Sequence, residues 1–193
     1  MESFWKQGFT LIELLVVIAI VAVLSVVVVL SLNPAELLRQ ARDSDRVSDT
    51  AILKSAVSLF LVDGLATSSL SLGTSNKCYI DGPATNTCVG WFSSQLASNG
   101  TSTTSTRSVN GGGWVPINFS LLSAGSPMSA EPIDPVNNSS YFYSYISTTT
   151  SNGFKLAALM ESIKYSASGT SDFESTDGGT STSTYEQGTN LSL

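Results

Sequence analysis

Histidine is absent from the 193-residue sequence, and its absence excludes several kinds of chemistry. Without an imidazole there is no Ser-His catalytic pair, no histidine general base and no histidine ligand for zinc. The sequence also contains no GxSxG, GxxxxGK or GxGxxG pattern, so the usual signatures of a nucleophile or a phosphate-binding loop are missing. We therefore predict that the protein is not an enzyme, and a membrane-tethered enzyme is the least favoured alternative.

Charged side chains are scarce, at 12% of the sequence, and the net charge is −6. Residues 63–193 carry four basic and nine acidic side chains, a net charge of −5 with no basic cluster. Binding to nucleic-acid phosphates depends on clustered lysine and arginine side chains. Nucleic acid is therefore not an expected partner, although a small local site stays open.

Cysteine is nearly absent as well, with Cys78 and Cys88 as the only two residues of this type. Two cysteines alone cannot complete a zinc site. If this part of the chain lies outside the cytoplasm, a disulfide between them is the natural interpretation. Two free thiols in a reducing compartment are the alternative.

The most prominent feature of the sequence is a long run of apolar residues near the N-terminus. Residues 14–32 carry no charge, and their polar side chains are limited to Ser25 and Ser31. As a helix this run is about 28 Å long, enough to cross a bilayer core, where backbone groups must be paired internally. We predict one transmembrane helix over about residues 14–32, with a buried core helix as the alternative.

The flanks of this run distinguish an anchor from a secretory signal peptide. A signal peptide has its cleavage site after the apolar region, with small residues at the cut, and the sequence that starts at Asn33 does not have this form. Lys6 precedes the run, which favours a cytoplasmic N-terminus and places the rest of the chain outside.

Glu13 is the one carboxylate at the edge of the apolar run. A lone charge there is unfavourable unless it is paired or reaches the membrane interface. The residues alone leave both explanations open, because Lys6 is the only cation near this edge.

The segment from Gly8 to Glu13, GFTLIE, and the apolar residues that follow it resemble the cleavage and methylation segment of type IV prepilins and type II secretion pseudopilins. The resemblance implies that prepilin peptidase cuts after Gly8 and methylates the new N-terminus at Phe9. It also implies that Glu13 meets the N-terminal amine of a neighbouring subunit during assembly. The implied partners are prepilin peptidase, identical or different pilin subunits, the inner-membrane assembly machinery and the membrane itself.

Three segments follow from this interpretation: a leader over 1–8, a long helix over 9–62 and an extracytoplasmic Ser/Thr-rich β head over 63–193. Pro34 is expected to weaken the helix locally. The second half of the helix is expected to lay Ile52, Ala56 and Leu59 against the head.

The charged middle of this helix, residues 39–49, contains oppositely charged side chains three or four positions apart, which suggests pairs such as Arg42 with Asp45 and Arg46 with Asp49. We expect these side chains to face either solvent or neighbouring subunits. The carboxylates Glu161 and Glu186 in the head have no evident partner in the sequence.

In the head, strands are predicted over 114–119, 141–146 and 154–160, whereas 65–113 is expected to be mostly loop. The strand over 141–146 is predicted from the alternation of tyrosines at 141, 143 and 145 with Phe142, Ser144 and Ile146. Together these features predict an α+β fold in which a long N-terminal helix packs on a small antiparallel sheet, as in pilins. Residues 132–138 resemble the loop that precedes a strand in pseudopilins, but lack the usual aromatic residue and glycine after the second proline.

Asp172, Glu174 and Asp177 form the one dense acidic group in the head. Oxygen ligands at such spacing suit calcium, and some pseudopilins hold calcium in a C-terminal loop. The alternative is a solvated acidic turn, and no other cofactor is expected.

The sequence therefore predicts a structural subunit of a type IV pilus-like or type II secretion pseudopilus filament. It would be a single-pass protein of the inner membrane before assembly and part of an extracellular filament afterwards. The alternative is a minor pilin that binds a surface or DNA, through a basic and aromatic patch of Trp91, Phe92, Arg107 and Trp114.

Overall fold

The computed structural model describes residues 8–64, 71–83, 88, 100–148 and 152–193. The chain forms two compact units, Met1–Leu38 and Arg39–Leu193, which are described separately. The first unit consists mainly of helix α1, Leu11–Leu32, and the second contains most of helix α2, Pro34–Gly64, together with the sheet.

A single residue, Asn33, separates the two helices and has a left-handed backbone conformation with φ 43°. Pro34 disfavours helical geometry at the residue before it, and asparagine tolerates the left-handed region better than most residues. The Asn33 carbonyl accepts hydrogen bonds from the amides of Glu36 and Leu37, so α2 begins at once. The predicted weak point is therefore a one-residue interruption, with Pro34 at the first helical position, where proline is favoured.

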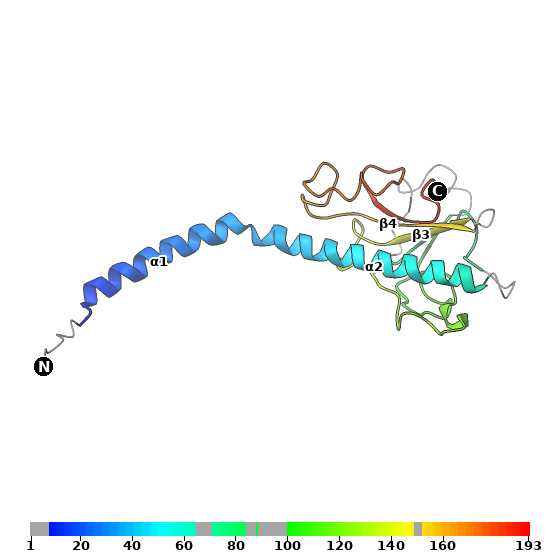
Figure 1. Cartoon of the computed structure of the whole chain (residues 1–193), viewed down its shortest axis with the longest axis horizontal. Helices are drawn as coiled ribbons and strands as arrows, with labels where there is room; N and C mark the ends of the chain where they lie inside the picture. Colours follow the sequence, from blue (N-terminus) through cyan, green and yellow to red (C-terminus); the bar gives the residue numbers. More distant parts are fainter. Residues whose placement is uncertain (1–7, 65–70, 84–87, 89–99, 149–151) are drawn as a thin grey trace, which may run out of the picture. The chain divides into compact units, whose positions relative to one another are not determined.

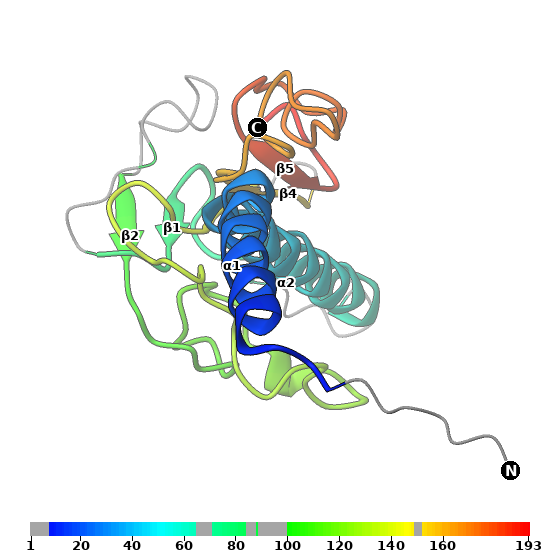
Figure 2. The same cartoon turned by 90° about the vertical axis from the view of Figure 1, so that its left-hand side faces the viewer.

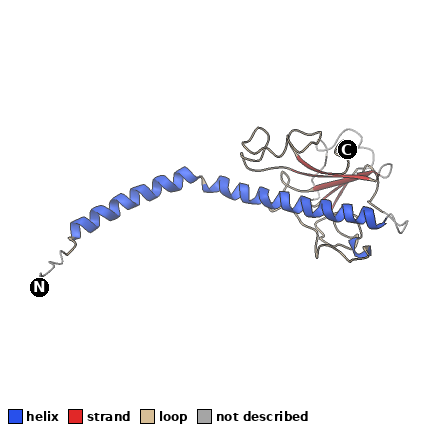
Figure 3. Ribbon diagram, viewed as in Figure 1, coloured by secondary structure: helices blue, strands red, loops and turns tan. Residues whose placement is uncertain are grey.

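The head is built on a five-stranded sheet with strand order β2-β1-β3-β4-β5 (Figures 1 and 3). All neighbouring strands are antiparallel except β1 and β2, which are parallel. A short 3-10 helix, η2, covers Phe119–Leu121. The strands are β1 Cys78–Ile80, β2 Thr101–Thr103, β3 Ser144–Thr148, β4 Gly153–Ala158 and β5 Tyr185–Gly188.

Helix α2 packs on one face of this sheet, which confirms the predicted α+β class. Figure 2 shows β1 and β2 to the left of α2, and β4 and β5 with the C-terminus above it. The core between α2 and the sheet contains Leu53, Ala56, Val57, Phe60, Tyr143, Tyr145, Phe154 and Leu156, among others.

The predicted helix face is partly wrong. Ala56 is buried as expected, but Ile52 and Leu59 are 45% and 43% exposed, and Leu53, Val57 and Phe60 take their place in the core. Both sets have helical spacing. The sheet determines which set is buried, and the sequence pattern alone does not.

The alternation predicted around β3 is confirmed by the two cores. Tyr143 and Tyr145 belong to the core that contains α2, whereas Phe142 and Ile146 pack with the Cys78–Cys88 pair on the other face. This is the two-residue period of a strand that is covered on both faces.

Other strand predictions need correction. Residues 114–119 do not form a strand: an isolated bridge joins Asn110 to Asn118, and Phe119 starts η2. Conversely, β1 and β2 lie in the Ser/Thr-rich part that we expected to be loop, and β5 was not predicted. Strands of three or four residues are too short to produce a clear hydrophobic period.

The charged segment of α2 does not simply face solvent, contrary to the sequence-based expectation. Arg46 and Asp43 are fully buried, and Arg46 Nη1 lies 2.7 Å from Asp43 Oδ1. Its Nε and Nη2 donate to both carboxylate oxygens of Asp134, at 2.6 and 2.9 Å. Arg42 makes the same two-pronged contact with Glu161, at 2.7 and 2.5 Å.

These contacts fasten α2 to two distant parts of the head. Burial opposes the charge of Arg46, but its hydrogen bonds to Asp134 and Asp43 raise its pKa above the ordinary value. The bonds from Arg42 lower the pKa of Glu161, which is therefore not isolated. Asp49 accepts a hydrogen bond from the Tyr143 hydroxyl at 2.9 Å, so it is not the partner of Arg46.

Candidate functional site

The segment with the most specific sequence signal lies at the start of α1. Gly8 has no atom within 4 Å of where a Cβ would lie, and Phe9 is 79% exposed. Thr10 caps the helix with an extended backbone, and its side-chain oxygen accepts the Glu13 amide at 3.3 Å. The bond that the peptidase is predicted to cut therefore lies in an accessible stretch just before the helix.

Glu13 completes this cap from the other direction. Its Oε2 accepts the Thr10 backbone amide at 2.9 Å and the Thr10 hydroxyl at 2.6 Å. This reciprocal arrangement is a capping box, which satisfies backbone donors that a helix start leaves unpaired. Sequence reasoning identified Glu13 but missed Thr10 as its partner, although Thr-x-x-Glu is a recognisable signature of this motif.

The surface of α1 beyond Glu13 is apolar on all sides. No residue of α1 is buried in the structure, and every residue from Leu14 to Leu32 is exposed, with Ser25 and Ser31 as the polar members. Among the described residues, one helical stretch is long and apolar enough to cross a membrane, and α1 is its apolar part. A surface of this kind must be covered by lipid or protein, because exposing it to water is strongly unfavourable.

Cys78 and Cys88 are joined by a disulfide, with Cα atoms 6.3 Å apart. Cys78 lies in β1, and both residues pack in the core on the sheet face away from α2. The bond therefore ties the segment after β1 back to the sheet.

The three carboxylates proposed for calcium are each engaged with backbone amides. Asp172 accepts from Ser168 and Ser175, Glu174 from Met160 and Ala167, and Asp177 from Gly179 and Glu186. No group of three or more acidic or cysteine side chains in the described part of the chain is arranged to hold a metal ion. The structure thus does not bring these residues together as a calcium site.

This arrangement leads to a test with added metal. Since the carboxylates already hold the turns of the loop, we expect calcium or a chelator to leave the thermal unfolding midpoint of the protein unchanged. The measurement is differential scanning fluorimetry of the same protein sample with added calcium and, separately, with added chelator. A midpoint that rises by several degrees with calcium would show that the loop does bind the ion.

Glu186, which had no evident partner in the sequence, pairs with a fully buried lysine. Lys155 Nζ in β4 lies 2.6 Å from Glu186 Oε1 in β5. The amides of Thr180 and Ser181 donate to Glu186 Oε2, and a Cβ at Gly179 would collide with this oxygen. The pair therefore fixes the C-terminal strand, and its surroundings are those of a structural contact.

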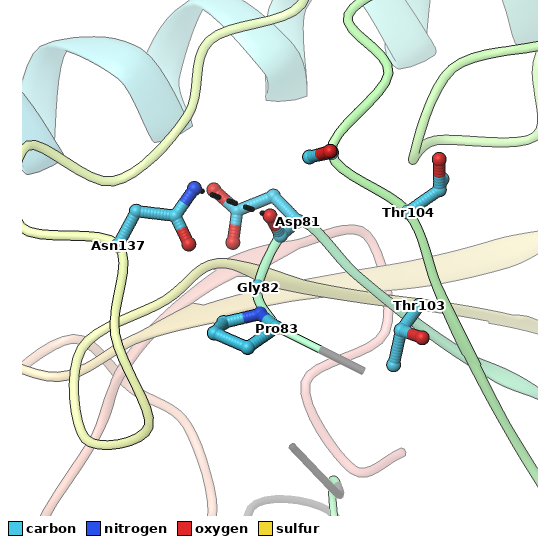
Figure 4. A pocket seen from close by; sticks show the side chains of 7 residues that line it. Asp81, Gly82, Pro83, Thr103, Thr104 and Asn137 are labelled. Atoms are coloured by element: carbon cyan, nitrogen blue, oxygen red, sulfur yellow. Dashed lines mark hydrogen bonds between the residues drawn. The ribbon is translucent and has the colours of Figure 1, made fainter. Parts of the chain in front are cut away.

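A polar pocket of about 490 Å³ opens beside β2 (Figure 4). Asp81, one of its lining residues, accepts hydrogen bonds from the amides of Asp134 and Tyr143, at 2.8 and 2.7 Å, and the Asn137 side chain donates to the Asp81 carbonyl. Burial raises the pKa of Asp81 to about 7. Its hydrogen bonds make Asp81 a support for the neighbouring loops. The lining residues are Asp81, Gly82, Pro83, Thr103, Thr104, Ser105 and Asn137.

The proposed basic and aromatic patch is not supported by the residues that the structure describes. Trp114 is fully buried and donates from its indole nitrogen to the Pro132 carbonyl at 2.8 Å. Arg107 donates to the Glu131 carbonyl at 2.6 Å. Trp91 and Phe92 lie outside the described residues.

The exposed stretch at Gly8 and Phe9, the capped helix start and the apolar helix fit a membrane-anchored precursor. Residues 6–29 match the family model of the prokaryotic N-terminal methylation motif, the signal of type IV pilin and pseudopilin precursors. Searches of curated proteins and of solved structures found no match. The motif supports a type IV pilin-like or pseudopilin subunit that prepilin peptidase processes, with a membrane-anchored precursor.

Proposed function

We propose that the protein is a structural subunit of an extracytoplasmic filament, either a type IV pilus-like fibre or a type II secretion pseudopilus, and that it has no catalytic role. The observation that carries the proposal is the methylation motif over 6–29, which leads into a helix whose surface beyond Glu13 is apolar. Such a helix is stable in lipid before assembly and among the helices of neighbouring subunits afterwards.

The division of the chain supports this proposal. Between Phe9 and Glu36 the first unit has a mostly apolar exposed surface and one charged side chain, Glu13, which suits packing in a filament interior. The second unit has its own core, a disulfide and buried ion pairs, which suits an exposed head outside the cytoplasm. A structural filament subunit needs these two properties and no reactive site.

The test is the intact mass of the protein, expressed with and without prepilin peptidase. We expect the peptidase to remove residues 1–8 and to add one methyl group at Phe9. Replacing Gly8 by valine, which adds a branched side chain next to the scissile bond, should leave the chain uncut in the same cells. A wild-type chain that stays at full length beside an active peptidase would contradict the proposal.

A further inference from the structure

We propose that Lys155 and Glu186 become joined by an amide bond between Lys155 Nζ and the carboxyl carbon of Glu186, formed by the folded head itself with loss of one water molecule. This modification goes beyond the proposed filament function and does not depend on it. It converts the ion pair between β4 and β5 into a covalent link.

The first observation is that the two side chains meet on one covered face of the sheet. Both are 0% exposed. Lys155 is paired with Ile146 of β3, and Glu186 is paired with Ala157 of β4. Ile146 and Ala157 belong to the apolar core on the face away from α2. Since directly opposite residues share a face, the lysine and the glutamate lie in an apolar surrounding.

The second observation concerns the amine. Lys155 Nζ lies 2.6 Å from Glu186 Oε1, an oxygen bonded to the carbon that the amine would attack. Nζ also donates to the Leu191 carbonyl at 3.3 Å and to the Thr180 hydroxyl at 3.5 Å, which occupies two of its three N–H groups. Transfer of the third proton to Oε1 replaces two buried charges by a neutral amine and a carboxylic acid, and directs the nitrogen lone pair at Glu186.

The third observation concerns the carboxyl group. Its other oxygen, Glu186 Oε2, accepts the backbone amides of Thr180 and Ser181 at 2.6 and 3.1 Å. Attack on the carboxyl carbon places negative charge on this oxygen. Two fixed backbone N–H groups are the usual means of stabilising such a charge in acyl transfer. The site therefore contains a nucleophile, an acyl carbon and an oxyanion hole.

Asp177 supplies a group that can carry the proton. Its carboxylate accepts the amides of Glu186 and Gly179, so it lies beside the pair. Burial raises the pKa of Asp177, which increases the share of its protonated form. Asp177 takes a proton from the attacking nitrogen and delivers one to the leaving oxygen, as a general base and then a general acid.

The atoms of this reaction balance without a cofactor. The bond between Nζ and the carboxyl carbon forms, and the bond from that carbon to Oε1 breaks. Oε1 leaves as water with two of the three hydrogens of the ammonium group, and nothing is oxidised or reduced. Free ions in water do not condense in this way, but fixed contact raises the effective concentration and the apolar cover excludes the water that would reverse the step.

The consequence is a second covalent tie in the head. The link closes a loop between positions 31 residues apart and fastens β5, the last strand in the sheet order, to β4. A cross-link of this kind stabilises mainly by restricting the unfolded chain, as a disulfide does.

The experiment is mass spectrometry of the full chain, purified in detergent and reduced. We expect the intact mass to be lower than the sequence predicts by one water molecule. Trypsin cuts after lysine and arginine, so an unlinked head gives peptides 108–155, 156–164 and 165–193. A linked lysine is not cut, and the digest should contain 108–164 joined to 165–193. These peptides are the same before and after removal of the leader, so the result is independent of processing.

Two arginine variants provide the matched comparison. Lys155→Arg keeps the charge and the trypsin site, but a guanidinium group does not lose its proton and cannot form the bond. We expect this variant to have its full mass and to be cut at 155. Lys164→Arg, in the same segment, should lose one water molecule and give the linked species as the wild type does. Asp177→Asn should slow the appearance of linked peptide after a pulse of synthesis by roughly a hundredfold.

A wild-type chain of full mass, cut at Lys155, overturns the proposal whether or not the variants fold. Loss of water with separate peptides 156–164 and 165–193 overturns it as well, because cyclisation at Asp177-Gly178 gives the same mass without a link. Linkage of Asp177→Asn at the wild-type rate overturns the role assigned to Asp177.

Discussion

Replacing Arg46 by methionine is expected to destabilise the head by about 3–5 kcal/mol, the range for removing one partner of a buried ion pair. The variant leaves the carboxylates of Asp43 and Asp134, which are 0% and 2% exposed, without their shared cation. It also removes the guanidinium group that lies 5.0 Å from the centre of the Tyr141 ring. Because whole domains are stable by only about 5–15 kcal/mol, this loss is a large part of the total.

The measurement is urea unfolding of a soluble fragment, residues 35–193, followed by circular dichroism. Arg39→Met is the matched control, because Arg39 lies on the same helix but its side chain is 46% exposed and its Nε is 4.0 Å from Glu161. We expect that control to change stability by at most about 1 kcal/mol, as for other surface pairs. Adding Asp134→Asn to Arg46→Met should recover part of the loss, since it removes one unpaired charge.

If Arg46→Met unfolds at the wild-type urea concentration, the buried charges do not depend on Arg46 and the contact is not a structural one. If the control is equally destabilised, the effect belongs to the helix surface in general. Either result would contradict the assignment of Arg46 as the fastening point of α2.

The sequence predicted most accurately what is encoded locally. The segment from Gly8 to Glu13 and the apolar run after it are contiguous, so their pattern identifies a family model and a membrane helix without any tertiary contact. The alternating aromatic residues around β3 were equally informative, because a strand between two cores has a strict two-residue period.

Arg46 shows why the rest was not predictable. Its partner Asp134 is 88 residues away in the sequence, and the partner of Arg42, Glu161, is 119 residues away. Local spacing instead suggested pairs within the helix, such as Arg46 with Asp49. Charged side chains three or four positions apart are typical of an exposed face, and only the fold reveals that this one is covered.

The calcium site at the acidic group in the head stays a prediction, and the group illustrates a related point about spacing. Spacing along the chain shows that Asp172, Glu174 and Asp177 are near one another in sequence, but it does not show where each carboxylate points. In the structure each is used by a different pair of backbone amides. Backbone donors that need partners are invisible in a sequence pattern.

The second large effect expected is a loss of head stability as pH rises from about 4.5 to about 7. Burial raises the pKa of Asp81 to about 7, and burial raises the pKa of Glu131 to about 8. Glu131 is fully buried: its Oε2 accepts the Val115 amide at 3.0 Å, and its Oε1 has no hydrogen-bond partner among the described residues. No cation pairs with either carboxylate in the described part of the chain, so both favour the neutral form.

The direction follows from proton binding. In this pH range the unfolded chain has released the two protons, whereas the folded head still holds them. The free energy of unfolding therefore falls as pH rises, by about 1.4 kcal/mol per pH unit for each retained proton. The raised pKa values of Glu174 and Asp177, which also result from burial, act in the same direction. The lowered pKa of Glu161, caused by Arg42, acts in the opposite direction, but only at more acidic pH.

Glu131→Gln tests this explanation, because it keeps the shape of the neutral side chain and removes its titration. We measure the free energy of unfolding of fragment 35–193 in urea from pH 4.5 to pH 8.5. Its decrease with pH should be shallower in the variant than in the wild type by the contribution of about one proton, and the variant should be more stable than the wild type at pH 8. Asp172→Asn is the control: hydrogen bonds from Ser175 lower the pKa of this exposed carboxylate, so its own contribution lies at acid pH and the slope above pH 5 should not change. A wild-type stability that rises with pH across this range would mean that Asp81 and Glu131 are ionised in the folded head, and that cations or water from outside the described contacts compensate their charge.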